Sequence, residues 1–227
     1  MTVTARNLNR AAGLAAVAAG LLFIGVQINH PHLDATSITT TEMAIRGSLK
    51  ILMAVLALVG ITGMYLRQVK QAGVLGLVGY VLISTGYLLI MNTAFVAAYV
   101  LPSIAGTSSG YVNDVLAAAT NRSAIGNIGL LNTAIHLQGI TYLAGGLLFG
   151  IALYRAAVLA RWAAALLAVG GIVTAVLSVM PDAFYRLLAL PNGIAMMALG
   201  FSLWREQRPQ GVVPVTSGAV LDSVGAR

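Results

Sequence analysis

The sequence predicts an all-α membrane protein, a polytopic bundle of six transmembrane helices with both termini in the cytoplasm. Three observations predict it. The chain is 59% hydrophobic and only 8% charged, whereas soluble domains carry about 25% charged residues. Its apolar residues gather into long runs, and a transmembrane helix needs roughly 20 such residues. The basic residues recur between these runs in a pattern that indicates an orientation.

Six apolar runs are long enough to cross a bilayer. They lie near 11–28, 43–66, 73–100, 128–154, 159–180 and 187–204. The first follows two arginines, as the apolar part of a signal peptide would. It is longer than the roughly 7–15 residues of such a segment, and no small-residue cleavage site follows it. We therefore expect the first run to be an uncleaved span.

Basic residues in four segments fall on one side of the membrane if there are six spans. The positive-inside rule makes that side cytoplasmic. We therefore expect a multi-pass protein of the plasma membrane with both termini inside. Residues 1–208 form the six-span domain, and residues 209–227, rich in Pro, Gly, Ser and Val, form a flexible cytoplasmic tail. The basic residues are Arg6, Arg10, Arg67, Lys70, Arg155, Arg161, Arg205 and Arg208.

Composition also argues against several function classes. The net charge is +7, but the basic residues are scattered between apolar runs, whereas a nucleic-acid-binding protein clusters them on one face. The chain has no cysteine, which excludes disulfides, thiolate metal ligands and a cysteine nucleophile. No phosphate-binding loop, nucleophile elbow, zinc-protease motif or dinucleotide fingerprint is present. The partner that remains is the lipid bilayer, with a lipid or small molecule as the expected ligand and no cofactor indicated.

The segment Asn-His-Pro-His-Leu-Asp follows the first span on the outer side. Pro31 favours an extended backbone at the residue before it, so His30, His32 and Asp34 can share one face. Two imidazoles and a carboxylate form a candidate zinc set, with an open fourth position or a ligand from elsewhere. The alternative is a plain turn at the membrane surface. The candidates for a fourth ligand are Glu42, His136 and Asp182.

The second span begins with a capping-box pattern, in which Thr39 is the expected N-cap and Glu42 lies three residues on. Glu42, Arg46 and Lys50 then recur every four residues and form one charged stripe. Lys50 lies roughly 15 Å along this helix. Two interpretations remain open, because such a lysine either snorkels to the surface or faces an inner cavity that holds an anionic ligand.

Polar residues on the third and fourth spans lie at a similar depth. Asn92 lies about two turns before the outer end of its span, and Asn132 and His136 lie within the first two turns of theirs. With Lys50 they form a candidate ligand site, although the asparagines also suit hydrogen bonding between helices. His136 and Glu42 are the candidate proton-transfer residues. The long outer loop 101–127 contains a short helical pattern at 111–119.

Two segments carry a resemblance to a known group of proteins. These are "RNLNRAAGLAAVAAGLLFIG" at 6–25 and "HLQGITYLAGGLLFGIALYRAAVLARWAAALLAVGGIVTAVLSVM" at 136–180. The chain resembles, over about residues 6–204, a group of uncharacterised bacterial six-helix integral membrane proteins. The features that carry the likeness are His136 at the head of the fourth span, Phe149, and the pair Tyr154-Arg155. The resemblance implies a fold and no known reaction.

Four function classes remain open. The first is binding of a lipid or a small apolar or anionic ligand in an outer-leaflet cavity lined by Arg46, Lys50, Asn92 and Asn132. The second is a membrane-embedded enzyme that acts on a lipid or isoprenoid substrate through Glu42 or His136. The third is a small transporter, and the fourth is a structural or regulatory subunit.

Overall fold

The computed structural model describes residues 4–120, 122–177 and 189–206. Over these residues all the regular secondary structure is helical, with no β-strand. The chain order is α1 (Ala5–Gly25), η1 (Ser37–Thr39), α2 (Thr41–Arg67), α3 (Val69–Phe95), η2 (Val96–Val100), α4 (Leu101–Ile104), α5 (Ser109–Ala119), α6 (Leu130–Ala156), α7 (Arg161–Leu177) and α9 (Ala189–Glu206).

The long helices match the predicted spans closely, and the all-α fold class is confirmed. Within the described residues, four helices are long and apolar enough to cross a membrane: α1, α2, α6, and α3 continued through η2 and α4 to Ile104. The helices α7 and α9 occupy the predicted fifth and sixth spans, but the ends of these spans that face each other lie outside the described residues. The count of six spans therefore stays a prediction, as does the tail 209–227.

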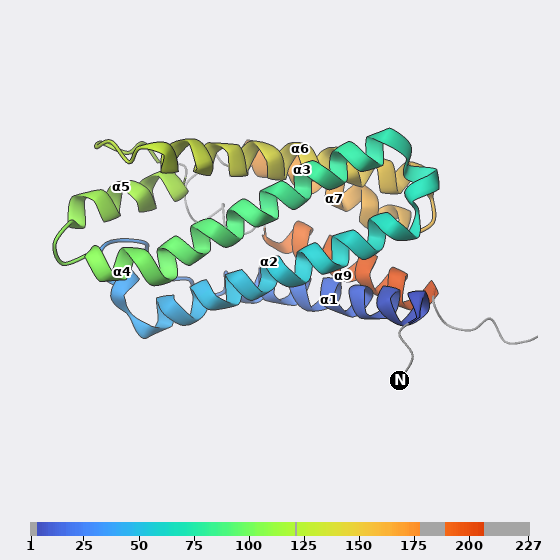
Figure 1. The fold of residues 1–227 in the computed structure, drawn as a ribbon, viewed down its shortest axis with the longest axis horizontal. Helices are drawn as coiled ribbons and strands as arrows, with labels where there is room; N and C mark the ends of the chain where they lie inside the picture. The colour runs from blue at the N-terminus through green and yellow to red at the C-terminus, as the bar shows by residue number, and fades with distance from the viewer. Residues whose placement is uncertain (1–3, 121, 178–188, 207–227) are drawn as a thin grey trace, which may run out of the picture.

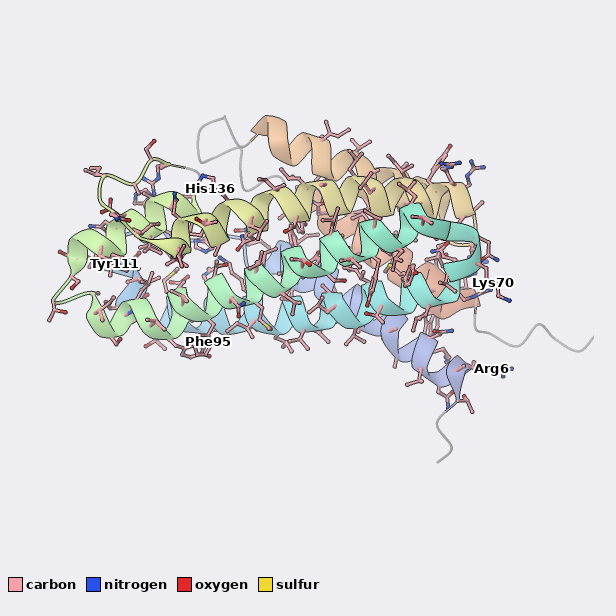
Figure 2. The ribbon with its side chains drawn as sticks, turned by 45° about the horizontal axis from the view of Figure 1, so that its top comes forward. Arg6, Lys70, Phe95, Tyr111 and His136 are labelled. Carbon is pink, nitrogen blue, oxygen red and sulfur yellow. The ribbon has the colours of Figure 1, made fainter. Side chains whose placement is uncertain are left out.

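The helices form a closed ring in which each packs on the next. α1 packs on α2 and α9, α3 packs on α2 and α6, and α7 joins α6 to α9. Figure 1 shows the start of α1, the α2–α3 turn, the α6–α7 turn and the end of α9 at one end of this ring. Arg6 and Lys70 lie at this end in Figure 2, so we call it the basic end, whereas Tyr111 and His136 lie toward the other end, the loop end.

Small residues bring the helices of the ring close together. Gly13 on α1 faces Gly200 on α9, and a Cβ built on either glycine would lie 2.6–2.7 Å from the carbonyl oxygen of the other. Gly86 on α3 lies against the backbone of Tyr142 on α6. In a bilayer, where apolar helices gain little from leaving lipid, such close packing is a principal source of helix association.

A cluster of buried apolar residues covers the loop end of the ring. Buried residues of α5, including Val112, Val115 and Leu116, pack with Met43 of α2 and Leu101 of α4. Figure 1 shows α5 between α4 and α6 at this end. The helix expected at 111–119 is therefore confirmed over Ser109–Ala119. This helix covers the loop end of the bundle, and we call it the roof. Its position follows from the apolar face that it buries.

The start of α2 differs from the predicted capping box by one residue. The N-cap is Thr40, whose side chain accepts a hydrogen bond from the N–H of Met43. Thr39 instead ends η1, and its hydroxyl donates to the carbonyl oxygen of Thr36. Three successive threonines are chemically equal as caps, so the preceding turn of η1 decides which of them holds the helix start.

Candidate functional site

A cavity of about 410 Å³ lies inside the ring at the loop end. Its walls come from α1, α2, α3, η2, α5, α6 and α9, and from the segment that joins α1 to α2. Alanine and glycine residues supply much of the wall, among them Gly47, Ala94, Ala97, Ala119 and Gly139. The volume falls within the range of pockets that hold small molecules. The space therefore exists because residues that fill little volume meet from several helices.

Lys50 reaches this cavity and contacts His30. The Lys50 Nζ lies 3.2 Å from His30 Nε2, and His30 Nδ1 lies 2.9 Å from the carbonyl oxygen of Pro31. Because a carbonyl can only accept, Nδ1 carries the proton, and Nε2 accepts from the lysine. His30 is only 6% exposed. The contact with His30 holds the Lys50 side chain at the cavity wall.

Arg46 joins α2 to the end of α1. Its Nη1 donates to the carbonyl oxygens of Val26 and Ile28, each at 3.0 Å, and its Nη2 donates to that of Asn29 at 3.3 Å. Its Nε donates to Glu42, and the two side chains form an ion pair. No basic residue lies in the last turn of α1, so Arg46 provides the positive charge that a helix C-terminus favours. Arg46 borders the cavity, and its guanidinium already has structural partners.

A further positively charged side chain lines the cavity, from the segment that follows the roof helix α5. Arg122 follows α5, and its backbone N–H donates to the carbonyl oxygen of Ala117. Its Nε donates to the hydroxyl of Thr120 at 3.0 Å. Asp114 holds the following loop by accepting from the N–H groups of Ile125 and Gly126. This anchoring places the Arg122 side chain in the cavity lining.

Three of the residues that the sequence analysis placed in the ligand site lie on other faces of their helices. Asn92, Asn132 and His136 are exposed and do not line the cavity. Polar residues that do line the cavity from these helices are Thr93 on α3 and Gln138 on α6. The Thr93 hydroxyl donates a hydrogen bond of 2.7 Å to the Gln138 side-chain oxygen. One residue along a helix turns the side chain by about 100°, which separates Asn92 from Thr93.

Asn192 is a further polar lining residue that the sequence analysis missed. It lies in the first turn of α9 and is only 4% exposed. A signal was available, because Asn192 follows Pro191 at the start of an apolar run, where a proline commonly opens a helix. The order of the helices in the ring, which brings α9 beside α1 and α7, could not be read from that pattern.

The structure does not bring His30, His32 and Asp34 together as a metal site. His30 faces Lys50. The Asp34 carboxylate instead accepts from the backbone N–H groups of Ser37 and Thr36 at 2.7 and 2.8 Å, which holds the start of η1. Within the described ranges no three His, Asp or Glu residues gather in a way that could hold a metal ion. The proposed fourth ligand Asp182 lies outside those ranges.

The turn at Asp34 is expected to lose stability as the pH falls. Hydrogen bonds from the N–H groups of Ser37 and Thr36 lower the pKa of Asp34 below its ordinary value of 3.8. The unfolded chain therefore binds the proton first as pH falls, so the turn is fully stabilised above the ordinary pKa and loses this stabilisation as pH drops through the lowered folded pKa.

Hydrogen exchange of the Thr36 and Ser37 amides, corrected for the intrinsic pH dependence, measures this loss. Protection is expected to fall in the acid range in the native chain. It should change much less in Asp34→Asn, which keeps an acceptor oxygen but does not titrate. Equal acid dependence in both proteins would contradict the assignment.

Comparisons with known proteins do not identify the chain. No family model, no curated protein and no solved structure matches it. A function must therefore be inferred from the geometry and the charge of the cavity.

Proposed function

We propose that this is an integral membrane protein that binds a lipid or a small apolar or anionic ligand in the loop-end cavity. The observation that carries the proposal is the cavity of about 410 Å³, whose lining combines apolar side chains with Lys50 and Arg122. Binding pockets typically pair a mostly apolar wall with a few polar groups that orient the ligand. The cavity has this composition.

The expected orientation places this cavity in the outer leaflet of the plasma membrane. The basic end then lies in the cytoplasm, in agreement with the positive-inside rule. Both chain termini lie on the cytoplasmic side in this proposal, which requires all six spans. Four helices with the length and composition of membrane spans support the membrane setting.

A pair of single cysteines tests the orientation, and the chain contains no native cysteine to interfere. Thr107 is exposed at the loop end, and Gln71 is exposed beside the α2–α3 turn at the basic end. In intact cells a membrane-impermeant maleimide is expected to label Thr107→Cys but not Gln71→Cys. After the cells are permeabilised both should react. Labelling of Gln71→Cys alone in intact cells would reverse the orientation.

The geometry favours binding over the acid–base enzyme. Glu42 is ion-paired with Arg46 and does not line the cavity. His136 is exposed, and its Nδ1 hydrogen-bonds to the carbonyl oxygen of Asn132, one turn earlier on α6. A proton-transfer residue must reach the substrate within hydrogen-bond distance, and neither side chain lines the loop-end cavity.

We also propose membership of the uncharacterised group of six-helix membrane proteins that the chain resembles. The helix order supports this proposal, with three long helices, a helical outer segment and then α6. The Tyr154-Arg155 pair lies at the basic end of α6, where the Arg161 guanidinium stacks over the Tyr154 ring at 4.4 Å.

Native mass spectrometry of protein released in mild detergent tests ligand binding. A Cβ built on Gly139 meets nothing within 4 Å, and the residue lines the cavity. Gly139→Leu therefore adds side-chain volume at the cavity wall without a backbone clash. Gly110 on α5 has the same open space and is absent from the lining, so Gly110→Leu is the control.

The expected result is a non-protein mass retained by the native chain and by Gly110→Leu, and lost from Gly139→Leu. Retention by all three proteins would place the ligand elsewhere. A bare polypeptide mass in every case would favour a structural or regulatory subunit.

A further inference from the structure

We propose that the ligand carries a carbonyl oxygen on an apolar chain, and that the side-chain amide nitrogen of Gln138 donates a hydrogen bond to this oxygen inside the loop-end cavity. The inference rests on the proposed function, because it assumes that the loop-end cavity is the ligand site. It adds the group by which the ligand is recognised and the residue that recognises it.

The cavity lies where α3 and α6 part. Nearer the basic end the two helices are in contact, with Gly79 against Phe149 and, two turns on, Gly86 against Tyr142. One turn further toward the loop end, a Cβ on Gly139 meets nothing within 4 Å. Figure 1 shows α3 drawing away from α6 in this direction. The side chains of this turn therefore border the cavity instead of a packed interface.

Gln138 lies on the face of α6 that lines this space. The lining residues of α6 fall at positions i, i+3, i+4, i+7 and i+8, the spacing of one helical face, and they are Ile135, Gln138, Gly139, Tyr142 and Leu143. Gln138 is half-buried, and among the described residues its Nε2 has no hydrogen-bond partner. Because this unpaired nitrogen is not fully enclosed by protein, its two N–H groups are available to a molecule in the cavity.

Thr93 fixes which end of the Gln138 amide is left for the ligand. The Thr93 hydroxyl oxygen lies 2.7 Å from Gln138 Oε1, and 3.1 Å from the carbonyl oxygens of Leu89 and Ile90. The shortest of these contacts has the usual length of an O–H···O bond and is short for an N–H···O bond. The hydroxyl proton therefore goes to Oε1, which leaves the amide nitrogen for the ligand.

This arrangement favours a carbonyl oxygen as the bound group. The amide nitrogen offers donors only, so the ligand must supply an acceptor. A carbonyl oxygen accepts and brings no proton of its own. The proton of an alcohol would need a further acceptor, at a place where the Gln138 oxygen already accepts from Thr93. A donor that is covered by the ligand and left without a partner is costly, so a pure hydrocarbon binds less well.

The apolar chain of the ligand has a place on the side of the basic end. About one turn beyond Thr93 and Gln138 in that direction, the lining includes the apolar side chains of Met53, Ile90 and Leu143. A ligand with its carbonyl oxygen at Gln138 and its chain beside these residues satisfies both parts of the wall. An ester and a ketone share the required chemistry.

A matched set of ligands tests the acceptor. Methyl dodecanoate and methyl undecyl ketone carry the carbonyl oxygen as an ester and as a ketone. The alkene in which a methylene group replaces the ketone oxygen has nearly the same shape and no acceptor. We would titrate each into the native protein in mild detergent and count adducts by native mass spectrometry. At least one carbonyl compound is expected to bind about tenfold more tightly than the alkene, the scale of a buried donor that gains or loses its partner.

Two glutamine variants separate the residue from the cavity. Gln138→Met keeps the length of the side chain and removes the donor. The carbonyl compounds are then expected to bind no better than the alkene, whose own affinity should not fall. Gln27 also lines the cavity, and no described hydrogen bond fixes its side chain. Gln27→Met is therefore the matched control and should keep the preference for the carbonyl. Loss of the preference in Gln27→Met alone would overturn the assignment to Gln138.

The infrared stretching frequency of the bound carbonyl reports the hydrogen bond even if Gln138→Met does not fold. In the native protein this frequency is expected to lie below that of the same compound in an alkane solvent, because a hydrogen bond weakens the C=O bond. Thr93→Val removes the hydroxyl that orients the amide, and it is expected to move the frequency back toward the alkane value. A native frequency equal to the alkane value would overturn the inference.

The outcomes distinguish this inference from the proposed function. Tighter binding of the ester or of the ketone identifies the source of the carbonyl. Equal binding of all three compounds by the native protein would overturn the inference and leave the cavity as the binding site, provided that Gly139→Leu abolishes binding. If no compound binds, or if Gly139→Leu binds all of them normally, the proposed function fails as well.

Discussion

Gly86→Ala is expected to lower the free energy of unfolding by about 1–3 kcal/mol, the typical cost of overpacking a tight interior. The added Cβ would lie 2.8 Å from the Cα of Tyr142 and 2.9 Å from its backbone nitrogen. Because these contacts are with backbone, α3 and α6 must move apart. The two helices form the most extensive pairing in the ring, so the separation disturbs packing along their length.

Gly139→Ala is the matched control, because it places the same methyl group on a helix of the same pair. A Cβ at Gly139 meets nothing within 4 Å, and alanine is the better helix former by about 1 kcal/mol. Gly139→Ala is therefore expected to be neutral or slightly stabilising. The measurement is the midpoint of thermal unfolding in one detergent. Equal midpoints for the two variants would show that the α3–α6 contact is not as close as described.

Arg46→Ala is expected to lower the free energy of unfolding by about 2–3 kcal/mol, the scale of hydrogen bonds to a charged group. The change removes the donors that satisfy the carbonyl oxygens of Val26, Ile28 and Asn29. These carbonyls lie at the end of α1, where helical partners are missing. Hydrogen exchange should increase first at the end of α1 and in the adjoining residues of the α1–α2 segment.

Glu42→Gln separates the helix-end contacts from the ion pair. It removes the ion pair and leaves the three carbonyl contacts of Arg46 in place. The Glu42 side chain is 55% exposed, and exposed ion pairs contribute about 1 kcal/mol or less. A small loss of stability is therefore expected in Glu42→Gln. If it destabilises the protein as much as Arg46→Ala does, the ion pair, and not the helix end, is the main role of Arg46.

The sequence predicted the helices well because their signal is local. Apolar runs mark α2, α3 and α6 within a few residues, and α1 begins six residues before its run. The spacing that placed Glu42 and Arg46 on one stripe agrees with the ion pair between them. The contact between His30 and Lys50 could not be predicted in this way. It joins residues 20 positions apart and needs the chain reversal at Asn29, which has a φ of 49°.

The composition of the cavity was harder to predict than its depth. In a soluble helix, polar residues mark the exposed face, but a helix in a bilayer is apolar on most sides. Asn92 and Thr93 are adjacent and both polar, so nothing local indicated that Thr93 faces the cavity. His136 was chosen for its chemistry, while Gln138, two residues later, lines the space. Which side chains face the cavity depends on which helices pack beside each other. The local sequence pattern does not reveal that packing.

A crystal structure of the protein grown from a lipid mesophase would show directly whether the loop-end cavity holds a ligand. We expect non-protein density inside the cavity, in contact with lining residues such as Met53, Gly139 and Leu143. A cavity that holds only ordered water, or that side chains fill completely, would contradict ligand binding at this site.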